Sequence, residues 1–464
     1  MKIRTLCCVL ALAGAACTEN GQPSGSVDSL STPVASLTLA PFETYQLSAA
    51  AFGADDSALT IPISWRSADT TIATVSDSGE VVAKAEGNVS LIAKAESESV
   101  TVALRVVSSF TAVAFTESAS CALRTTGTVW CWGGQWPATG AALAGGGTFQ
   151  ELAGGGVSYL GRPAFCGLTS GGSVACWGED GNPPLLGVGS DTGYFATAPV
   201  AVTGGFTAVL SVGVGYFQAC LVTAGGSLYC WGRGNHGEAG VNLGGGFFIA
   251  SVPDSVLTTV KFAQITPARY FTCGLTGAGA AYCWGSNSWG AVGNDTSTEV
   301  DVLVPVPVAG GHVFTKLVAG YDHPCGLTTD SEIWCWAEND EGEAGSGVVG
   351  QYLTSPVHSA PSLHFTDLAG GDDVTCGIAT DSLTYCWGAG AGLGAGDAVV
   401  GGDFPNPVAV AGHHRFVHLF SGRGAVCGVT VGGAAYCWGK ATNGGNLGDG
   451  VTVSSTVPIR VLDP

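Results

Sequence analysis

The stretch that decides the fold is CGLTGAGAAYCWG (residues 273–285), in which two cysteines ten positions apart flank a glycine-bearing turn. Apolar residues on both sides of such a turn are typical of a β-hairpin, and nine intervening residues place the cysteines opposite each other. The same spacing occurs seven times in the chain. The seven pairs are Cys121 and Cys131, Cys166 and Cys176, Cys220 and Cys230, Cys273 and Cys283, Cys325 and Cys335, Cys376 and Cys386, and Cys427 and Cys437.

Cysteines that face each other across a hairpin bring their Cβ atoms within reach of a disulfide. Structural zinc sites usually space paired ligands roughly two to four residues apart, so a separation of ten residues fits a metal poorly. We therefore predict one disulfide in each hairpin and no metal site.

The hairpins recur with a period that indicates a repeat architecture. Successive first cysteines are 45, 54, 53, 52, 51 and 51 residues apart, which is typical of propellers and arrays. Each unit adds an apolar strand such as FTKLVAG (314–320), a variable tip such as YDHP (321–324) and a proline-led strand such as PVPV (305–308) to the hairpin. Four strands in each of seven units predict an all-β, seven-bladed β-propeller.

The order CGLT, turn, YCWG, glycine-rich loop and PVxV resembles the repeat of the RCC1 (regulator of chromosome condensation) family over residues 108–464. This resemblance implies an RCC1-like propeller whose variable tips lie on one face around the central axis. The tryptophan of each CWG motif is expected to pack between blades. Because the chain enters at FTAVAF (110–115) and ends in VPIRVL (457–462), we expect the last strand to pair into the first blade and close the ring.

A different pattern precedes the propeller. Residues 34–107 alternate apolar and polar residues in short strands, which favours a β-sandwich, and residues 17–33 have the small polar composition of a flexible linker. The segment resembles the bacterial Ig-like group 2 domain, which implies a spacer or adhesive module with Trp65 in its core. The residues that carry this resemblance are Trp65, Ile72, Ala73, Val75, Gly79, Val81, Ala83 and Gly87.

The N-terminus, MKIRTLCCVLALAGAACTEN (1–20), has Lys2 and Arg4 before an apolar run, as in a secretory signal peptide over residues 1–16. Gly14 to Cys17 resembles a bacterial lipobox, with Gly14 where leucine is usual. We expect Cys17 to carry the lipid, or the chain to be secreted without one. The expected location is the bacterial cell envelope, at the outer membrane or cell surface, or the exterior, with membrane contact only through the lipid.

Composition narrows the range of functions. The chain has 16 Lys and Arg against 36 Asp and Glu, a net charge of −20, which disfavours nucleic-acid binding. The residues show no catalytic constellation, so we expect no enzyme activity and no cofactor. His413, His414 and His418 lie close together in the sequence, but a packed or solvated face explains them better than a metal. No feature indicates a homo-oligomer.

The variable tips therefore become the candidate binding site, because loops on a rigid scaffold carry function. We expect them to bind a protein partner, with a surface glycan stacked on the aromatic rings as the alternative and simple capping of the propeller as a third reading. Asp372 and Asp373 as a hydrolytic pair are poorly placed, since adjacent strand residues point to opposite sides. The candidate binding residues are Tyr159, Tyr216, Phe217, Arg269, Tyr270, Phe271, Tyr321, Asp322, His323 and Arg423, beside Asp372 and Asp373.

Lipidation makes a direct prediction about Cys17. The variant Cys17→Ser loses the thiol that would carry the acyl chains, so the protein should leave the membrane fraction. Metabolic labelling with an alkynyl fatty acid, followed by fractionation, measures this, with Cys8→Ser as the control that keeps Cys17. Label retained by Cys17→Ser, or absent from the unsubstituted protein, would contradict lipidation at this residue.

Overall fold

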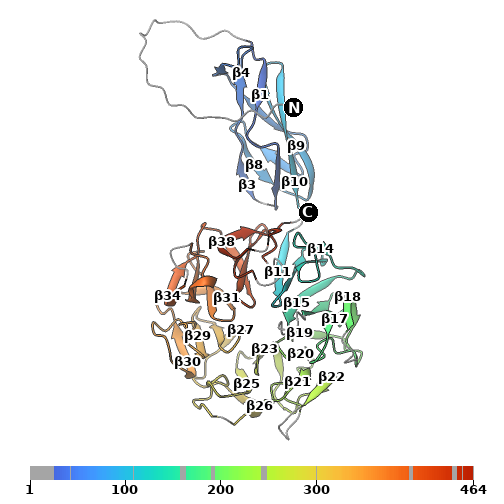
Figure 1. Cartoon of the computed structure of the whole chain (residues 1–464), viewed down its shortest axis with the longest axis vertical. Helices are drawn as coiled ribbons and strands as arrows, with labels where there is room; N and C mark the ends of the chain where they lie inside the picture. The colour runs from blue at the N-terminus through green and yellow to red at the C-terminus, as the bar shows by residue number, and fades with distance from the viewer. Residues whose placement is uncertain are drawn as a thin grey trace. The chain divides into compact units, whose positions relative to one another are not determined.

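The computed structural model describes residues 26–41, 43–107, 109–156, 163–189, 194–241, 248–298, 300–396, 401–441, 447–451 and 453–462. The chain divides into two compact units, Met1–Leu39 with Glu43–Val106, and Ala40–Phe42 with Val107–Pro464 (Figure 1). Apart from the short 3-10 turn η1 (Gly390–Gly392), the regular structure of the described residues is β-strand. No helix in this part of the chain is long and apolar enough to cross a membrane.

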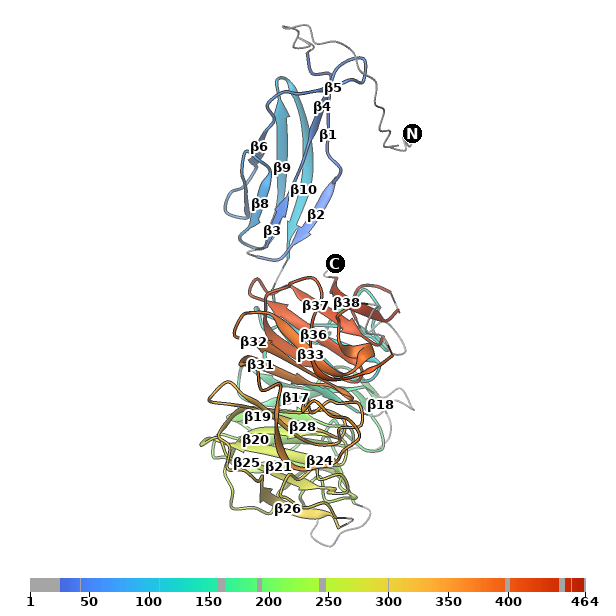
Figure 2. The ribbon, with the colours of Figure 1, turned by 90° about the vertical axis from the view of Figure 1, so that its left-hand side faces the viewer.

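The first unit is a sandwich of short strands (Figure 2). Its core is formed between two of the sheets: Trp65, Leu91 and Val102 of the first sheet pack with Ala73 and Val81 of the second. Trp65 is buried, which confirms its predicted place in the core. The sheets are β2 (Ser36–Leu39), β10 (Glu98–Val106), β9 (Gly87–Ala95) and β6 (Ser64–Ser67); β3 (Thr44–Gln46), β8 (Glu80–Ala83) and β7 (Ala73–Val75); and β1 (Ser29–Ser31), β4 (Ala50–Phe52) and β5 (Ala58–Leu59).

The second unit is a ring of seven four-stranded antiparallel sheets, each made from four consecutive strands, as predicted (Figure 1). Blades 1 to 4 are β11 (Phe110–Phe115), β12 (Ala119–Arg124), β13 (Val129–Gly133), β14 (Ala141–Ala142); β15 (Phe149–Gly155), β16 (Ala164–Thr169), β17 (Val174–Asp180), β18 (Tyr194–Ala201); β19 (Val209–Val214), β20 (Gln218–Thr223), β21 (Leu228–Arg233), β22 (Ile249–Ser255); and β23 (Phe262–Pro267), β24 (Phe271–Thr276), β25 (Ala281–Gly285), β26 (Val302–Pro307). Blades 5 to 7 are β27 (Phe314–Ala319), β28 (Pro324–Thr328), β29 (Ile333–Ala337), β30 (Leu353–Ser359); β31 (Phe365–Gly370), β32 (Val374–Ala379), β33 (Thr384–Ala389), β34 (Asp403–Ala409); and β35 (Phe416–Ser421), β36 (Ala425–Thr430), β37 (Ala435–Gly439), β38 (Ser455–Arg460).

The predicted closure of the ring by a shared strand is wrong. The last strand, β38, pairs with β37 of its own blade, where Ile459 lies opposite Cys437. The first blade supplies its own fourth strand, the two-residue β14, because the strand after each glycine-rich loop folds back onto its own hairpin. Blades 7 and 1 contact each other without sharing a strand. Their apolar residues form one core, and the Phe110 amide donates to the Gly433 carbonyl at 2.7 Å.

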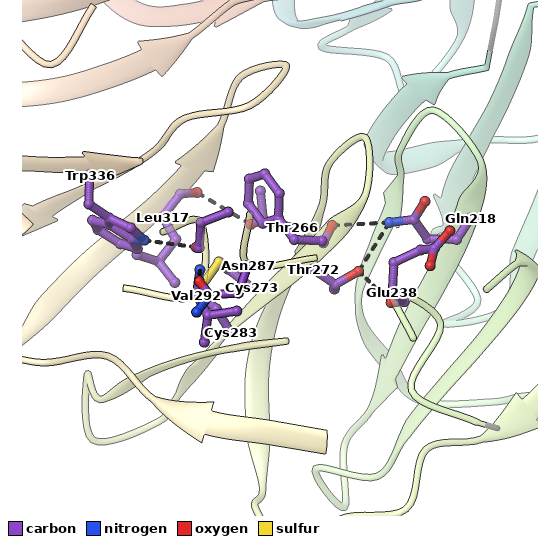
Figure 3. Close-up of a disulfide and its surroundings, with 12 residues drawn as sticks. Gln218, Glu238, Thr266, Thr272, Cys273, Cys283, Asn287, Val292, Leu317 and Trp336 are labelled. Carbon is purple, nitrogen blue, oxygen red and sulfur yellow. Dashed lines mark hydrogen bonds between the residues drawn. A yellow bond between two sulfur atoms is a disulfide. The ribbon is translucent and has the colours of Figure 1, made fainter. Parts of the chain in front are cut away.

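All seven predicted disulfides are present, one in each hairpin. The cysteines are direct register partners, as Cys273 and Cys283 show, and the Cα atoms of that pair lie 4.1 Å apart (Figure 3). Each crosslink therefore fixes the register of the two central strands of a blade.

The tryptophans of the CWG motifs, and of the CWA motif in blade 5, join each blade to the one before it, which confirms their predicted packing role. All seven are almost fully buried. Among the described residues, the indole N–H of five blades donates to a carbonyl in the loop of the preceding blade. Trp336, for example, donates to Ala291 at 3.0 Å, and a Cβ on Gly293, which has a positive φ, would lie 2.7 Å from its Nε1 (Figure 3).

This interaction predicts unequal effects for two similar substitutions. Trp336→Phe leaves the Ala291 carbonyl without its indole donor and should lower the free energy of unfolding by about 2–4 kcal/mol. The Trp177 indole N–H has no hydrogen-bond partner among the described residues, so Trp177→Phe should cost about 1 kcal/mol less. Urea denaturation compares the two variants, and equal losses would show that the hydrogen bond adds nothing to the packing.

Candidate functional site

The loops between the first and second strands of the blades meet around the propeller axis, as the sequence predicted. They border a cavity of about 90 Å³ lined by residues from all seven blades, among them Glu117, Tyr216, Asp372 and Arg423. Several innermost strands have a glycine at or just after their last residue, because the neighbouring backbone comes too close for a side chain: a Cβ on Gly155 would collide with the Gly215 carbonyl. The glycines thus allow tip residues from distant blades to touch.

A hydrogen-bonded chain crosses the axis. The Tyr216 hydroxyl of blade 3 donates to Oδ1 of Asp372 in blade 6 at 2.6 Å. Arg423 of blade 7 places Nε 3.1 Å from Oδ2 of Asp372 and Nη1 2.7 Å from Oε2 of Glu117 in blade 1. Four blades are therefore joined by their tips, although Tyr216 and Asp372 are 156 residues apart in the chain.

Aromatic rings and guanidinium groups extend this chain through blades 4 and 5. Tyr216 makes an edge contact with Tyr321 at a centroid distance of 4.8 Å. The Arg269 guanidinium lies 4.0 Å from the Tyr321 centroid and 4.4 Å from that of Tyr270, and it pairs with Asp322 at 3.0 Å. Such cation–π contacts and the ion pair hold the rings in fixed positions.

Arg233, His236 and Glu117 belong to the site but are absent from the sequence-based candidates. Arg233 lies 3.4 Å from the centroid of Phe217, and His236 makes an edge contact with Tyr270 at 5.0 Å. Both follow the CWG motif of blade 3: Arg233 is the last residue of β21, and His236 lies in the loop after it, which sequence reasoning treated as a connector. Alignment of the tips could have found Glu117, because it holds the position in the first repeat that Tyr216 holds in the third.

The predicted tip residues divide by depth. Tyr216, Arg269, Tyr270, Tyr321 and Arg423 are partly exposed. Four others are only 0–3% exposed and support the surface from beneath: Phe217, Phe271, Asp322 and His323. Tyr159 lies outside the described residues.

The tip face is strongly acidic at blades 5 and 6. Burial, together with the charges of Asp322 and Glu343, raises the pKa of Glu338 to about 8. Burial also raises the pKa of Asp322 to about 6 against the lowering effect of Arg269, and burial raises the pKa of Asp372 to about 6. These carboxyl groups therefore change charge near neutral pH.

The structure also places two other groups of side chains that the sequence brought to notice. Asp372 is held by Tyr216 and Arg423, while Asp373 has no ion pair among the described residues. The ring of His414 packs against that of Tyr436 with the centroids 4.1 Å apart, and His418 Nδ1 lies 3.9 Å from Oδ2 of Asp367. The described residues contain no group of three His, Cys, Asp or Glu side chains placed to hold a metal.

Comparisons with known proteins agree with both units. The bacterial Ig-like domain (group 2) family matches residues 26–103, and the RCC1 repeat families match residues 110–135 and 278–327. The chain is a bacterial Ig-like domain followed by an RCC1-repeat propeller.

Relatives of the RCC1 propeller differ widely in length. The Ultraviolet-B receptor UVR8 of Arabidopsis thaliana is 25% identical over 61% of this chain, and the match spans 63% of the receptor. The E3 ubiquitin-protein ligase HERC2 of Homo sapiens is 26% identical over 39% of this chain and 4% of the ligase. The chain thus spans less than two thirds of either relative.

Solved structures share the propeller fold. Human WBSCR16 gives a TM-score of 0.58 at 15% identity, covering 71% of this chain and 89% of that chain. Yeast RCC1 (Prp20), solved with Kap60, gives a TM-score of 0.52 at 18% identity, covering 76% of this chain and 75% of that chain. At these identities the likeness concerns the fold alone.

The raised pKa of Glu338 predicts a pH-dependent gain in stability on substitution. Because the pKa is near 8 in the folded state and near 4.5 ordinarily, the ionised carboxylate weakens the fold increasingly between these pH values. Glu338→Gln should therefore raise the free energy of unfolding by about 1 kcal/mol at pH 8.5, a value discounted for partial exposure, and by much less at pH 5. Urea denaturation at both pH values measures this; a loss of stability at pH 8.5 would contradict it.

Proposed function

We propose that this chain is a non-enzymatic bacterial binding protein that recognises a protein partner through the tip face of its propeller. The bacterial Ig-like domain and seven disulfides support a place outside the cytoplasm, where disulfides persist. Lipidation of Cys17, which lies outside the described residues, would attach the protein to a membrane of the envelope.

The observation that carries the proposal is the connected network of tip residues. Tyr216, Tyr321 and Arg269 come from three different blades, yet hydrogen bonds, ring contacts and an ion pair fix them in one cluster. Tyrosine and arginine are the residues enriched at the centres of protein interfaces. Because their side chains are already ordered, binding would lose little conformational entropy.

The same contacts favour a protein over a glycan. Sugar recognition by stacking needs a free aromatic face, but Arg233 lies over Phe217 and Arg269 lies over both Tyr270 and Tyr321. What the face offers instead is a mixture of ring edges, guanidinium groups and carboxylates, which suits the mixed surface of a protein.

The absence of an enzyme activity is part of the proposal. Asp372, which lines the axial cavity together with Glu117, is engaged by Tyr216 and Arg423. The fourteen propeller cysteines are all bonded in disulfides, which removes them as nucleophiles. The face is therefore suited to binding.

Cross-linking on intact cells of the source organism, followed by affinity capture and mass spectrometry, tests this function. We expect a protein that is captured by the unsubstituted chain and lost with Tyr216→Ala/Tyr270→Ala/Tyr321→Ala, because three central anchors are removed. The single variant Tyr270→Ala guards against general unfolding and should reduce capture on its own.

The matched control is Leu210→Ala/Leu257→Ala/Val417→Ala, which shortens three exposed apolar side chains outside the tip loops. Capture that survives the tip variant, or is lost equally with the control, would contradict recognition by the tip face. Recovery of polysaccharide alone would replace the protein partner with a glycan.

A further inference from the structure

Two pairs of neighbouring blades share one backbone frame at their tips. The amide of Arg233 in blade 3 donates to the Phe217 carbonyl at 2.7 Å, and the amide of Glu338 in blade 5 donates to the Asp322 carbonyl at 3.4 Å. Arg233 and Glu338 each follow the CW motif of their own blade. They therefore occupy equivalent positions in the two frames.

The buried polar contacts beneath these positions are also the same. Thr272 donates its hydroxyl to the Glu238 carbonyl at 2.8 Å, and Thr375 does the same to Glu343 at 2.8 Å. Gln218 contacts Thr272 at 3.1 Å (Figure 3), and the corresponding His323 contacts Thr375 at 3.0 Å. The two frames thus share these buried contacts, although their surface residues differ.

In blades 3 and 4 the frame holds a cation. Arg233 lies 3.4 Å from the centroid of Phe217 and 5.9 Å from that of Tyr270, at the second tip positions of the two blades. Equivalent backbone hydrogen bonds identify the matching tip positions of blades 4 and 6. The Tyr270 carbonyl accepts from the Ser286 amide at 2.8 Å, and the Asp373 carbonyl accepts from the Ala389 amide at 2.7 Å. The space between these two tip positions, called the slot below, therefore holds a positive side chain of the chain itself in blades 3 and 4.

In blades 5 and 6 the slot carries three carboxylates, and Glu338 stands where blade 3 has the cationic Arg233. Asp322, Glu338 and Asp373 stand where blades 3 and 4 have Phe217, Arg233 and Tyr270. Asp322 is only 2% exposed; its Oδ2 pairs with Arg269, but its buried Oδ1 has no hydrogen-bond partner among the described residues. Glu338 has no ion-pair partner in the same part of the chain. An unpaired buried carboxylate oxygen costs free energy unless a donor reaches it.

The other charges around Glu338 make a positively charged partner still more favourable. Asp340 and Glu343 add negative charge beside it, while Arg423 and Lys440 act on Asp373 without forming an ion pair to it. The local excess is negative.

We propose that the slot formed by Asp322, Glu338 and Asp373 binds a cationic side chain, arginine or lysine, of the protein partner. The partner's cation would take the place that Arg233 takes in blades 3 and 4, with the partly exposed carboxylates of Glu338 and Asp373 accepting its N–H groups above the buried Asp322. The inference rests on the proposed function for the source of the side chain, but the charge preference of the slot is a property of this chain alone.

The first test therefore needs no partner. Glu338→Arg transplants the blade 3 arrangement into blade 5 and should raise the thermal unfolding midpoint at pH 7.5 above those of both the unsubstituted chain and Glu338→Gln. An arginine at this position that lowers the midpoint below that of Glu338→Gln would show that the slot does not accept a guanidinium group, and would overturn the inference.

The second test uses defined probes. The peptide acetyl-Gly-Arg-Gly-amide is titrated into labelled protein while the amide NMR signals of Glu338 and Asp373 are followed, with the citrulline peptide as a neutral match. We expect shifts with arginine and not with citrulline, and a loss of at least about tenfold in affinity for Glu338→Gln/Asp373→Asn. The control Asp330→Asn/Asp381→Asn changes the net charge equally at the hairpin turns of the same two blades and should retain binding.

The outcomes separate the two proposals. If the arginine peptide binds but no protein is captured, the charge preference of the slot is supported and the proposed protein partner is contradicted. A captured protein that binds Glu338→Arg and unsubstituted chains equally leaves the tip face as a binding site and overturns the slot. If Asp330→Asn/Asp381→Asn weakens peptide binding as much as Glu338→Gln/Asp373→Asn does, net charge alone explains the binding, and the proposed slot is contradicted.

Discussion

The propeller depends on the hydrogen bond between a buried tryptophan and a carbonyl of the preceding blade. In five blades the indole N–H reaches a loop carbonyl at 2.8–3.1 Å, and the ring packs against a glycine of that loop. A side chain on that glycine would meet the indole, so glycine and tryptophan require each other. The disulfide fixes the hairpin that carries the tryptophan, and the tryptophan then fixes the hairpin against its neighbour.

This constant frame leaves the tips free to differ in chemistry. Blades 3 and 5 place Arg233 and Glu338 on equivalent backbone, with opposite charge. Because all seven innermost strands approach closely at the axis, side chains from blades distant in sequence can also meet, as Tyr216 and Asp372 do. The result is one face with an aromatic and cationic sector and an acidic sector, on a scaffold that needs neither for its fold.

Local and repeated features were predictable from the sequence. Cysteine spacing indicated the hairpins and disulfides, the period near 50 residues indicated the blades, and the buried CWG tryptophans followed from repetition. The closure was wrong because a proline-led segment can complete its own blade or the next, and the sequence pattern is identical in both cases. The burial of Phe271 and His323 could have been predicted, since each lies at the start of the second strand of its blade.

The remaining contacts of the site arise only in three dimensions. The pairing of Tyr216 with Asp372 depends on the curvature of the whole ring, and the place of Arg233 over Phe217 depends on how the end of β21 packs against the tip of its blade. Neither has a local signal in the sequence. The tip residues before the hairpins could be proposed as a set, but Arg233, His236 and Glu117 were missed, and the partners of the tip residues could not be predicted.

The most direct measurement of the central claim, that the tip face is the binding surface, is site-specific photo-cross-linking in cells of the source organism. p-Benzoylphenylalanine would replace Tyr270 at the tips and, separately, the exposed Val431 in the hairpin turn of blade 7. The account predicts a discrete cross-linked protein from position 270 and none from position 431. A product from position 431 alone would place recognition on the opposite side of the blades and contradict the account.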